Sequence, residues 1–179
     1  MRSFDLRQRL LISLQITAEC NFRCPYCYIA GDGEGQEVGP EATRRFIRTV
    51  REELAGWEIS FHFAGGEVFL KDWAVLLIED LLEDGFFMSI VSNGSVLPER
   101  LLENPRCKKG AAQFTLEVSM DGLLGVHEAT RKDFATVLNS FVKILDSGIT
   151  TCVHTTVHRH NLKHMLDFSI FLNSLGEEH

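Results

Sequence analysis

The chain has 179 residues, 45% of them hydrophobic and 24% charged, the composition of a globular protein large enough to bury one core. Its net charge of −7 argues against a nucleic-acid partner, which would require a basic face. No apolar run is long enough for a membrane span, the N-terminus lacks a signal-peptide pattern, and five cysteines do not fit a disulfide framework. We therefore expect one domain over residues 1–179, in the cytoplasm and without a membrane partner.

The first predicted element is a strand over residues 10–17, because Ile12, Leu14 and Ile16 alternate with polar residues. The strand leads directly into the cysteine-rich run 20–27. Residues 31–39 are rich in glycine, which predicts a flexible connector.

The run 20–27 places Cys20, Cys24 and Cys27 within eight residues. A [4Fe–4S] cluster is normally held by four thiolates, so three in one loop leave one iron open to a substrate or cofactor. A structural zinc site is the main alternative, with a fourth ligand from Cys107, Cys152 or a downstream histidine. The spacing favours the iron–sulfur cluster.

Helix and strand patterns alternate through the rest of the chain. Pro40 suits the first turn of a helix, and apolar residues then recur every three or four positions. Asp72 and Asn161 stand where they can cap later helices, and Gly148 and Gly176 where helices end. The predicted helices cover residues 41–54, 73–84, 98–103, 134–145 and 162–175, and the later strands 59–64, 86–92, 114–121 and 150–158.

Alternation of strand and helix through five units predicts an α/β fold with a parallel sheet, as in a partial (β/α) barrel with its helices outside. One face of the strands is apolar, whereas a sheet covered on both faces would be apolar throughout. The other face therefore lines a polar cavity or lies against solvent, and we favour the cavity because the motifs below follow the carboxyl ends of strands. The polar face is formed by Ser13, Gln15, Thr17, Ser60, His62, Thr115, Glu117 and Ser119.

Several short motifs follow the predicted strands in a fixed order. They are Cys24-Pro25-Tyr26-Cys27-Tyr28, Gly65-Gly66-Glu67, Ser92-Asn93-Gly94, Ser119-Met120-Asp121-Gly122 with His127 and Arg131, and Thr155-Thr156-Val157 with Asn161-Leu162. The ordered set resembles the radical S-adenosylmethionine (SAM) superfamily, most closely its peptide- and protein-modifying maturases. That resemblance implies a partial (β/α)6 barrel, whereas only five units are visible here. Either the sixth strand is dispensable or the chain is a fragment.

The resemblance also implies roles for the motif residues. Cys20, Cys24 and Cys27 would hold the [4Fe–4S] cluster, and SAM would bind its open iron. Contacts to SAM are implied for Tyr26 near the adenine, for Gly65, Gly66 and Glu67 at the methionyl ammonium, for Ser92 and Ser119 at the methionyl or ribose groups, and for Arg131 at the methionyl carboxylate.

The implied activity is reductive cleavage of SAM to a 5′-deoxyadenosyl radical, which abstracts hydrogen from a peptide, protein or small-molecule substrate. An electron donor such as flavodoxin or ferredoxin is implied as a partner. A non-catalytic iron–sulfur electron-transfer or partner-binding subunit is the alternative, and a zinc-binding structural module is a third. The sequence assigns no role to Glu117. His154, His158, His160 and His164 are interpreted as cavity-edge or surface residues in preference to a metal cluster.

Overall fold

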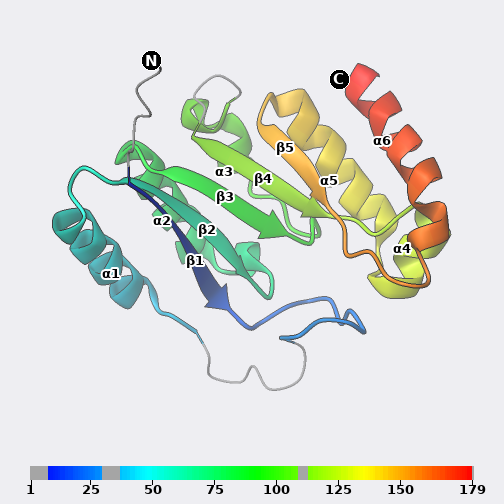
Figure 1. The fold of residues 1–179 in the computed structure, drawn as a ribbon. Coiled ribbons are helices and arrows are strands. Elements are labelled where there is room, and N and C mark those ends of the chain that lie inside the picture. The colour runs from blue at the N-terminus through cyan, green and yellow to red at the C-terminus, as the bar shows by residue number, and fades with distance from the viewer. Residues whose placement is uncertain (1–7, 30–36, 109–112, 179) are drawn as a thin grey trace, which may run out of the picture.

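The computed structural model describes residues 8–29, 37–108 and 113–178, and its five strands form one parallel sheet in the order β1-β2-β3-β4-β5 (Figure 1). Neighbouring strands follow one another in the sequence, so each connection is a crossover of the kind that parallel pairing requires. The strands are β1 (Arg9–Thr17), β2 (Glu58–Gly65), β3 (Phe87–Ser92), β4 (Phe114–Ser119) and β5 (Thr150–His154).

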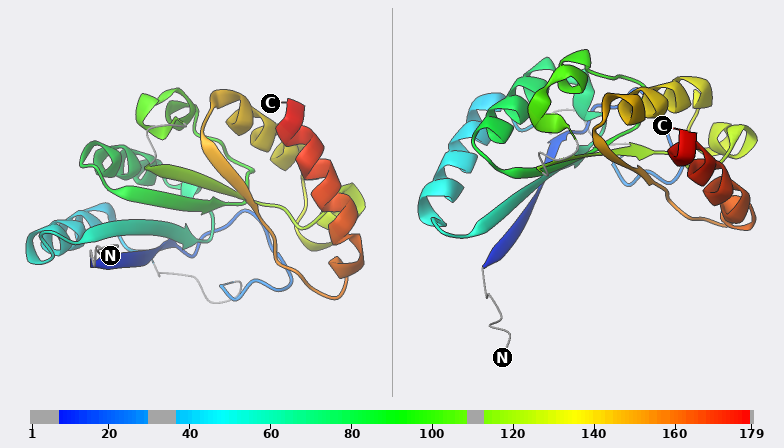
Figure 2. Two further views of the ribbon diagram at one scale, coloured as in Figure 1. Left: turned by 45° about the horizontal axis from the view of Figure 1, so that its top comes forward. Right: turned by 90° about the horizontal axis from the view of Figure 1, so that it is seen from above.

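The helices gather on one face of the sheet, and the sheet curves away from them (Figure 2). This arrangement confirms the predicted α/β fold of an open partial barrel with helices outside. None of the described helices is both long and apolar enough to cross a membrane. They are α1 (Pro40–Glu53), α2 (Asp72–Glu83), α3 (Glu99–Glu103), α4 (Leu124–Thr130), α5 (Phe134–Ser147) and α6 (Met165–Glu178), with 3-10 turns η1 (Val68–Leu70), η2 (Pro105–Cys107) and η3 (Leu162–His164).

The hydrophobic core lies between the sheet and these helices. Alternate residues of the central strands point into it, which is why the period-two pattern predicted them correctly. The fully buried side chains include Phe61 and Phe63 of β2, Ile90 of β3, Leu116 of β4, Ile78 and Leu82 of α2, and Phe168 of α6.

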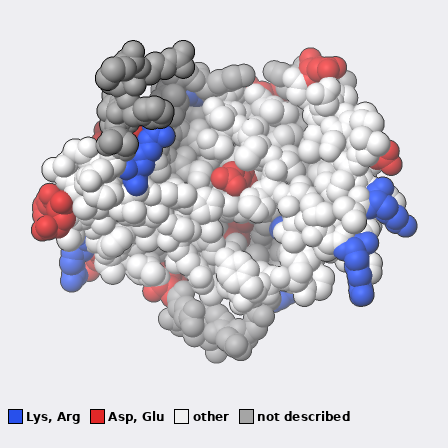
Figure 3. All heavy atoms as spheres, in the orientation of Figure 1, with Lys and Arg blue, Asp and Glu red and all other residues white. Residues whose placement is uncertain are grey.

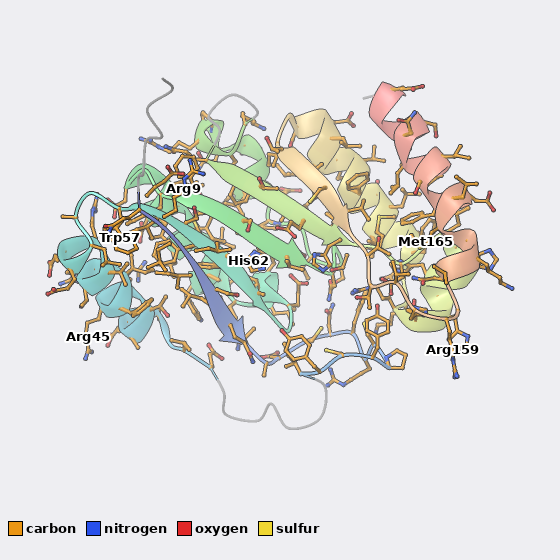
Figure 4. All side chains as sticks on the ribbon, in the orientation of Figure 1. Arg9, Arg45, Trp57, His62, Arg159 and Met165 are labelled. Atoms are coloured by element: carbon orange, nitrogen blue, oxygen red, sulfur yellow. The ribbon has the colours of Figure 1, made fainter. Side chains whose placement is uncertain are left out.

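The opposite face of the sheet is covered by none of the described helices (Figure 2) and carries most of the predicted polar side chains, although Thr17 and Ser119 at its carboxyl edge are buried. Ser13 and Gln15 of β1 are exposed, while Ser60, His62, Thr115 and Glu117 are half-buried. The curvature makes this face concave, and in Figure 4 His62 lies over the middle of the sheet. The face is thus an open hollow lined by polar groups.

The structure corrects several predicted boundaries. Helix α4 was not predicted, and α6 continues through Gly176, which takes no left-handed cap conformation. Asp72 is the first residue of α2, so Lys71 and not Asp72 stands at the N-cap position. Strand β5 ends at His154, and Thr155 Oγ1 and Thr156 N then donate hydrogen bonds to Met120 O and Asp121 Oδ1, just after the end of β4. Most of the predicted connector at 31–39 lies outside the described residues.

Candidate cluster and cofactor site

The three clustered cysteines lie in the loop that follows β1, at the carboxyl edge of the sheet. All three are free thiols and half-buried. The loop is tightened by the backbone hydrogen bond from Cys27 N to Cys24 O (3.1 Å) and anchored by Phe22, which is buried in the core. The sequence prediction of three neighbouring thiols in one loop therefore corresponds to a compact, anchored structure.

The surroundings of these thiols show that they lie close together and face hydrogen-bond donors. Burial raises the pKa of Cys24, the Arg131 charge lowers it, and the charges of Cys20 and Cys27 raise it again. Cys20 Sγ accepts hydrogen bonds from Phe22 N at 3.4 Å and Asn93 Nδ2 at 3.7 Å. Hydrogen-bond donors and the Arg131 cation therefore surround the sulfurs that are predicted to hold the cluster.

No three His, Cys, Asp or Glu side chains within the described ranges converge closely enough to hold a single metal ion. This geometry gives no support to the zinc alternative, in which the ligands surround one ion. A [4Fe–4S] cluster binds each cysteine at a different iron, so its sulfurs need not converge on one point. The half-buried, donor-facing thiols fit that cluster.

Gly65 and Gly66 end β2 where the backbone after β1 approaches most closely. A Cβ atom on Gly66 would lie 1.9 Å from Glu19 O, and Gly65 has a φ of +133° that side chains rarely adopt. Gly66 N donates to Thr17 O (2.7 Å), and Glu67 N donates to Glu19 O (2.8 Å). The two glycines thus allow β2 to hold the start of the cysteine loop.

The Glu67 carboxylate points into the protein and is fully buried. It accepts hydrogen bonds from Phe69 N (3.1 Å), Ser92 Oγ (3.0 Å) and Asn93 N (2.7 Å). Burial raises its pKa, and these hydrogen bonds oppose the rise. Two predicted site residues, Glu67 and Ser92, are therefore brought together and tie the ends of β2 and β3.

Asn93 carries this network to the cysteine loop. Its Nδ2 donates to Asn21 Oδ1 at 2.8 Å as well as to Cys20 Sγ, and its Oδ1 accepts from Ser95 N at 2.8 Å. Asn93 belongs to the Ser92-Asn93-Gly94 motif, but its residue type and position alone assign it no role. Its function depends on a partner 72 positions away, which no local pattern reveals.

Asp121, which follows β4, is the second centre of the site and is fully buried. Its Oδ2 accepts hydrogen bonds from the Tyr26 hydroxyl and from Thr130 Oγ1 (3.1 Å), and its Oδ1 accepts from Thr156 N (3.2 Å). Burial first, and then the bond to Asp121, raise the pKa of Tyr26, so the phenol remains a donor. One carboxylate thus links the cysteine loop, α4 and the segment after β5.

Arg131 lies between Asp121 and the cysteine loop. Its Nε is 3.1 Å from Asp121 Oδ2, without the geometry of a hydrogen bond, and its guanidinium carbon lies 5.6 Å from the centre of the Tyr26 ring. Its Nη1 is 3.9 Å from Cys24 Sγ. With the side chain only 10% exposed, this cation directly faces the predicted ligands.

His158, in the segment after β5, presents a buried polar atom to the same region. Its ring lies 5.5 Å from that of Tyr26, and its Nδ1 accepts a hydrogen bond from His160 N at 3.2 Å. Its Nε2 is buried and has no hydrogen-bond partner among the described residues. An unpaired buried donor beside Tyr26 fits a site built for a polar ligand.

The predicted site residues therefore fall into two groups around the cysteines. Glu67 and Ser92 form one with Asn93, and Tyr26 and Arg131 form the other with Asp121. Ser119 is buried at the end of β4, two residues before Asp121. Asn161 does not cap a helix: its Nδ2 donates to Asp121 O (3.0 Å) and Thr156 O (2.9 Å). Its full burial makes it part of the Asp121 group.

Comparison with known proteins agrees with this geometry. Residues 14–172 match the model of the radical SAM superfamily. Over 88% of this chain, the sequence is 28% identical to the PqqA peptide cyclase of Bradyrhizobium diazoefficiens. Over 92% of this chain, it is 21% identical to the subtilosin biosynthesis protein AlbA of Bacillus subtilis. It spans only 42% and 37% of those two relatives.

Solved structures share the fold. The native anSMEcpe structure with bound AdoMet superposes with a TM-score of 0.73 at 21% identity, covering 93% of this chain and 49% of that one. Streptococcus suis SuiB bound to its precursor peptide SuiA superposes with a TM-score of 0.71 at 15% identity, covering 93% and 38%. In both, the match is to less than half of the longer chain.

Proposed function

The chain belongs to the radical SAM superfamily, and on that premise we propose that it is a core domain with an iron–sulfur cluster and SAM side by side. Cys20, Cys24 and Cys27 would hold the cluster. The observation that carries this proposal is the arrangement of three half-buried thiols in one loop, with the Arg131 guanidinium 3.9 Å from Cys24 Sγ.

When bound, the cluster and SAM supply a one-electron cleavage of the sulfonium C–S bond, giving methionine and a 5′-deoxyadenosyl radical that removes a hydrogen atom from the substrate. The residues of the chain would hold these groups in position. Glu67 and Asn93 fix the loop on one side and Asp121 fixes it on the other. These contacts would hold the three cysteines, and any cluster bound to them, in one orientation.

The residues implied to contact SAM would divide into contact and positioning roles. Arg131 keeps N–H groups that can bind the methionyl carboxylate, a match suited to a guanidinium fork. Tyr26 and the unpaired Nε2 of His158 would lie at the adenine. Ser119 and the backbone of Gly65 and Gly66 would border the methionyl and ribose groups.

Glu67 and Ser92 would act indirectly. The Glu67 carboxylate is fully buried and receives three hydrogen bonds from its own chain, so it is not free to receive a ligand. Both residues would instead hold the backbone that SAM touches.

The substrate would be a peptide, because the similar proteins include a peptide cyclase and a bacteriocin biosynthesis protein. A flavodoxin or ferredoxin would supply the electron. We place the reaction in the cytoplasm, where a reducing environment keeps the cluster thiols free.

Anaerobic reconstitution with iron and sulfide tests the proposal. The chain is expected to bind about four irons, and with SAM and a strong reductant to form 5′-deoxyadenosine. Cys24→Ala should lose both the iron and the product. Cys152→Ala is the matched control, since Cys152 is also a free, accessible thiol but lies in β5, and it should retain both.

Two other results would overturn the proposal. A cluster that is unaffected by SAM and forms no product favours an electron-transfer subunit. Stoichiometric zinc with no iron uptake favours a structural module.

A further inference from the structure

A carboxylate flanked by two imidazoles lies on the open face of the sheet, outside the groups described above. Glu117 of β4 has Oε2 3.2 Å from His154 Nδ1 and Oε1 3.9 Å from His62 Nδ1. The Glu117 side chain is only 19% exposed. Figure 3, which views this face, shows acidic atoms near its middle, where the surface is hollowed.

Strand register places this carboxylate just below the carboxyl edge. Glu117 pairs with Val91 of β3 and lies two residues before the end of β4, roughly 7 Å along the strand from that edge. The residues directly opposite it on the two strands that pair with β4 are Val91 of β3, which is half-buried, and Cys152 of β5, which is exposed.

The hydrogen bonds leave one oxygen of Glu117 available. A carboxylate only accepts hydrogen bonds, so His154 Nδ1 is the donor to Oε2. His62 Nδ1 is instead paired with Ser89 Oγ at 2.7 Å, and its 3.9 Å separation from Oε1 is too long for a hydrogen bond. Oε1 can therefore receive a donor from a ligand.

The charge of Glu117 is not balanced by a permanent cation. In the described part of the chain its ion pairs are with the imidazoles of His62 and His154 alone, and with neither lysine nor arginine. Its field reaches the next strand, because the pKa of Cys152 is raised first by burial and then by the Glu117 charge. An unbalanced, partly desolvated carboxylate attracts a cation more strongly than an exposed one does.

We propose that Glu117, flanked by His62 and His154, binds a basic side chain of the peptide substrate and so presents a neighbouring residue to the cysteine loop. This inference depends on the proposed function for its peptide ligand. The geometry favours an ammonium or guanidinium group over a bound metal ion, because no three ligating side chains within the described ranges converge on one point.

Two capped pentapeptides test the inference. Each has four alanines around a central residue, which is lysine in one peptide and norleucine in the other. The norleucine side chain is similar in length to that of lysine but carries no charge. Binding is measured by calorimetry on the anaerobically reconstituted chain with SAM. The wild type should bind the lysine peptide about tenfold more tightly, as expected for a charge-assisted hydrogen bond.

The Glu117→Gln variant keeps the shape of the side chain and should lose this preference. Glu58→Gln is the matched control: Glu58 is an acid at the start of β2, paired with Arg9 at 3.3 Å, and its loss should leave the preference intact. Equal binding of the two peptides by the wild type, or binding of neither, overturns the inference without reference to any variant. A preference that survives in Glu117→Gln overturns it as well.

Formation of 5′-deoxyadenosine by the wild type without peptide tests the proposed function separately. Lysine preference without deoxyadenosine would overturn the proposed function and leave the binding site standing. Deoxyadenosine without lysine preference would do the reverse.

Discussion

Asp121 shows how one buried side chain determines the geometry of the candidate site. It compensates the Arg131 cation and accepts hydrogen bonds from three segments that are far apart in the sequence. A buried cation that loses its partner destabilises a fold strongly, because it cannot recover its hydration. The site and the stability of the fold are therefore coupled through this residue.

Asp121→Asn should lower the free energy of unfolding by about 3 kcal/mol, since it leaves the Arg131 charge buried without a counter-charge. Asp84→Asn is the matched control. Asp84 pairs with Arg51 at 2.9 Å, but both side chains are about half exposed, so the loss should be below about 1 kcal/mol. Urea unfolding of the reduced chain, followed by circular dichroism, measures both. Equal losses in the two variants would contradict the assigned role of Asp121.

The buried carboxyl group of Glu67 should make the stability of the folded protein depend on pH. Burial raises its pKa in the folded protein above the usual value of 4.5, so the folded state binds the proton more tightly than the unfolded state does. Its contribution to the free energy of unfolding is then largest below pH 4.5 and falls as the pH rises through the raised pKa.

Urea unfolding of the wild type and of Glu67→Gln across this pH range tests the sign. The stability of the wild type relative to the variant should decrease as the pH increases. A relative stability that increases with pH would mean that the three hydrogen bonds to the carboxylate outweigh its burial.

At the scale of elements, the end of β2 and the loop after β1 fit together only because Gly66 has no side chain. The neighbouring atoms belong to the Ala18–Glu19 backbone, which cannot move aside as a flexible side chain can. The same loop carries the three thiols, so strain at this contact is transmitted to the candidate cluster ligands.

Gly66→Ala should therefore reduce the free energy of unfolding by about 2 kcal/mol and reduce iron binding on reconstitution. Gly125→Ala is the matched control, because Gly125 lies in helix α4 with open space around its Cα. This control should keep its iron and gain up to about 1 kcal/mol, since alanine favours a helix. Urea titration and iron analysis measure the two effects. Full iron binding by Gly66→Ala would contradict the close fit.

At the scale of the whole molecule, the sequence predicted the parts that depend on local pattern. All five strands and five of the six described helices were predicted, since alternating or helical apolar spacing reflects which side chains face the core. Helix α4 was missed because it is short, contains Gly125 and buries only His127 and Thr130, so it has no apolar stripe.

The candidate site was predictable only in part, because local sequence patterns do not reveal contacts between distant segments. The cysteines are informative through their spacing, and Arg131 and Tyr26 through the family resemblance. Asn161 was misread as a helix cap because its partners, Asp121 and Thr156, are apparent only after folding. Hydrogen bonds between distant segments leave no periodic signal in a single sequence.

The order of the strands also predicts how stability is distributed across the sheet. β3 lies between two partners and carries the fully buried Ile90, whereas β5 pairs with β4 alone among the described strands and alternates between exposed and half-buried residues. Elements with fewer buried contacts open more readily without global unfolding. Amides of β5 that bond to β4 should therefore exchange with solvent at least about tenfold faster than those of β3, after correction for intrinsic rates.

Native-state hydrogen exchange read by mass spectrometry measures this difference. Amides of β2, which like β3 lies between two partners, are the internal control and should be protected to the same degree as β3. Equal protection of β5 and β3 would show that the sheet opens only as one unit. Because Glu117 bonds to His154 at the end of β5, local opening of β5 would also disturb the proposed site for the basic side chain. A lysine peptide bound there should slow exchange in β5 and leave β2 unchanged.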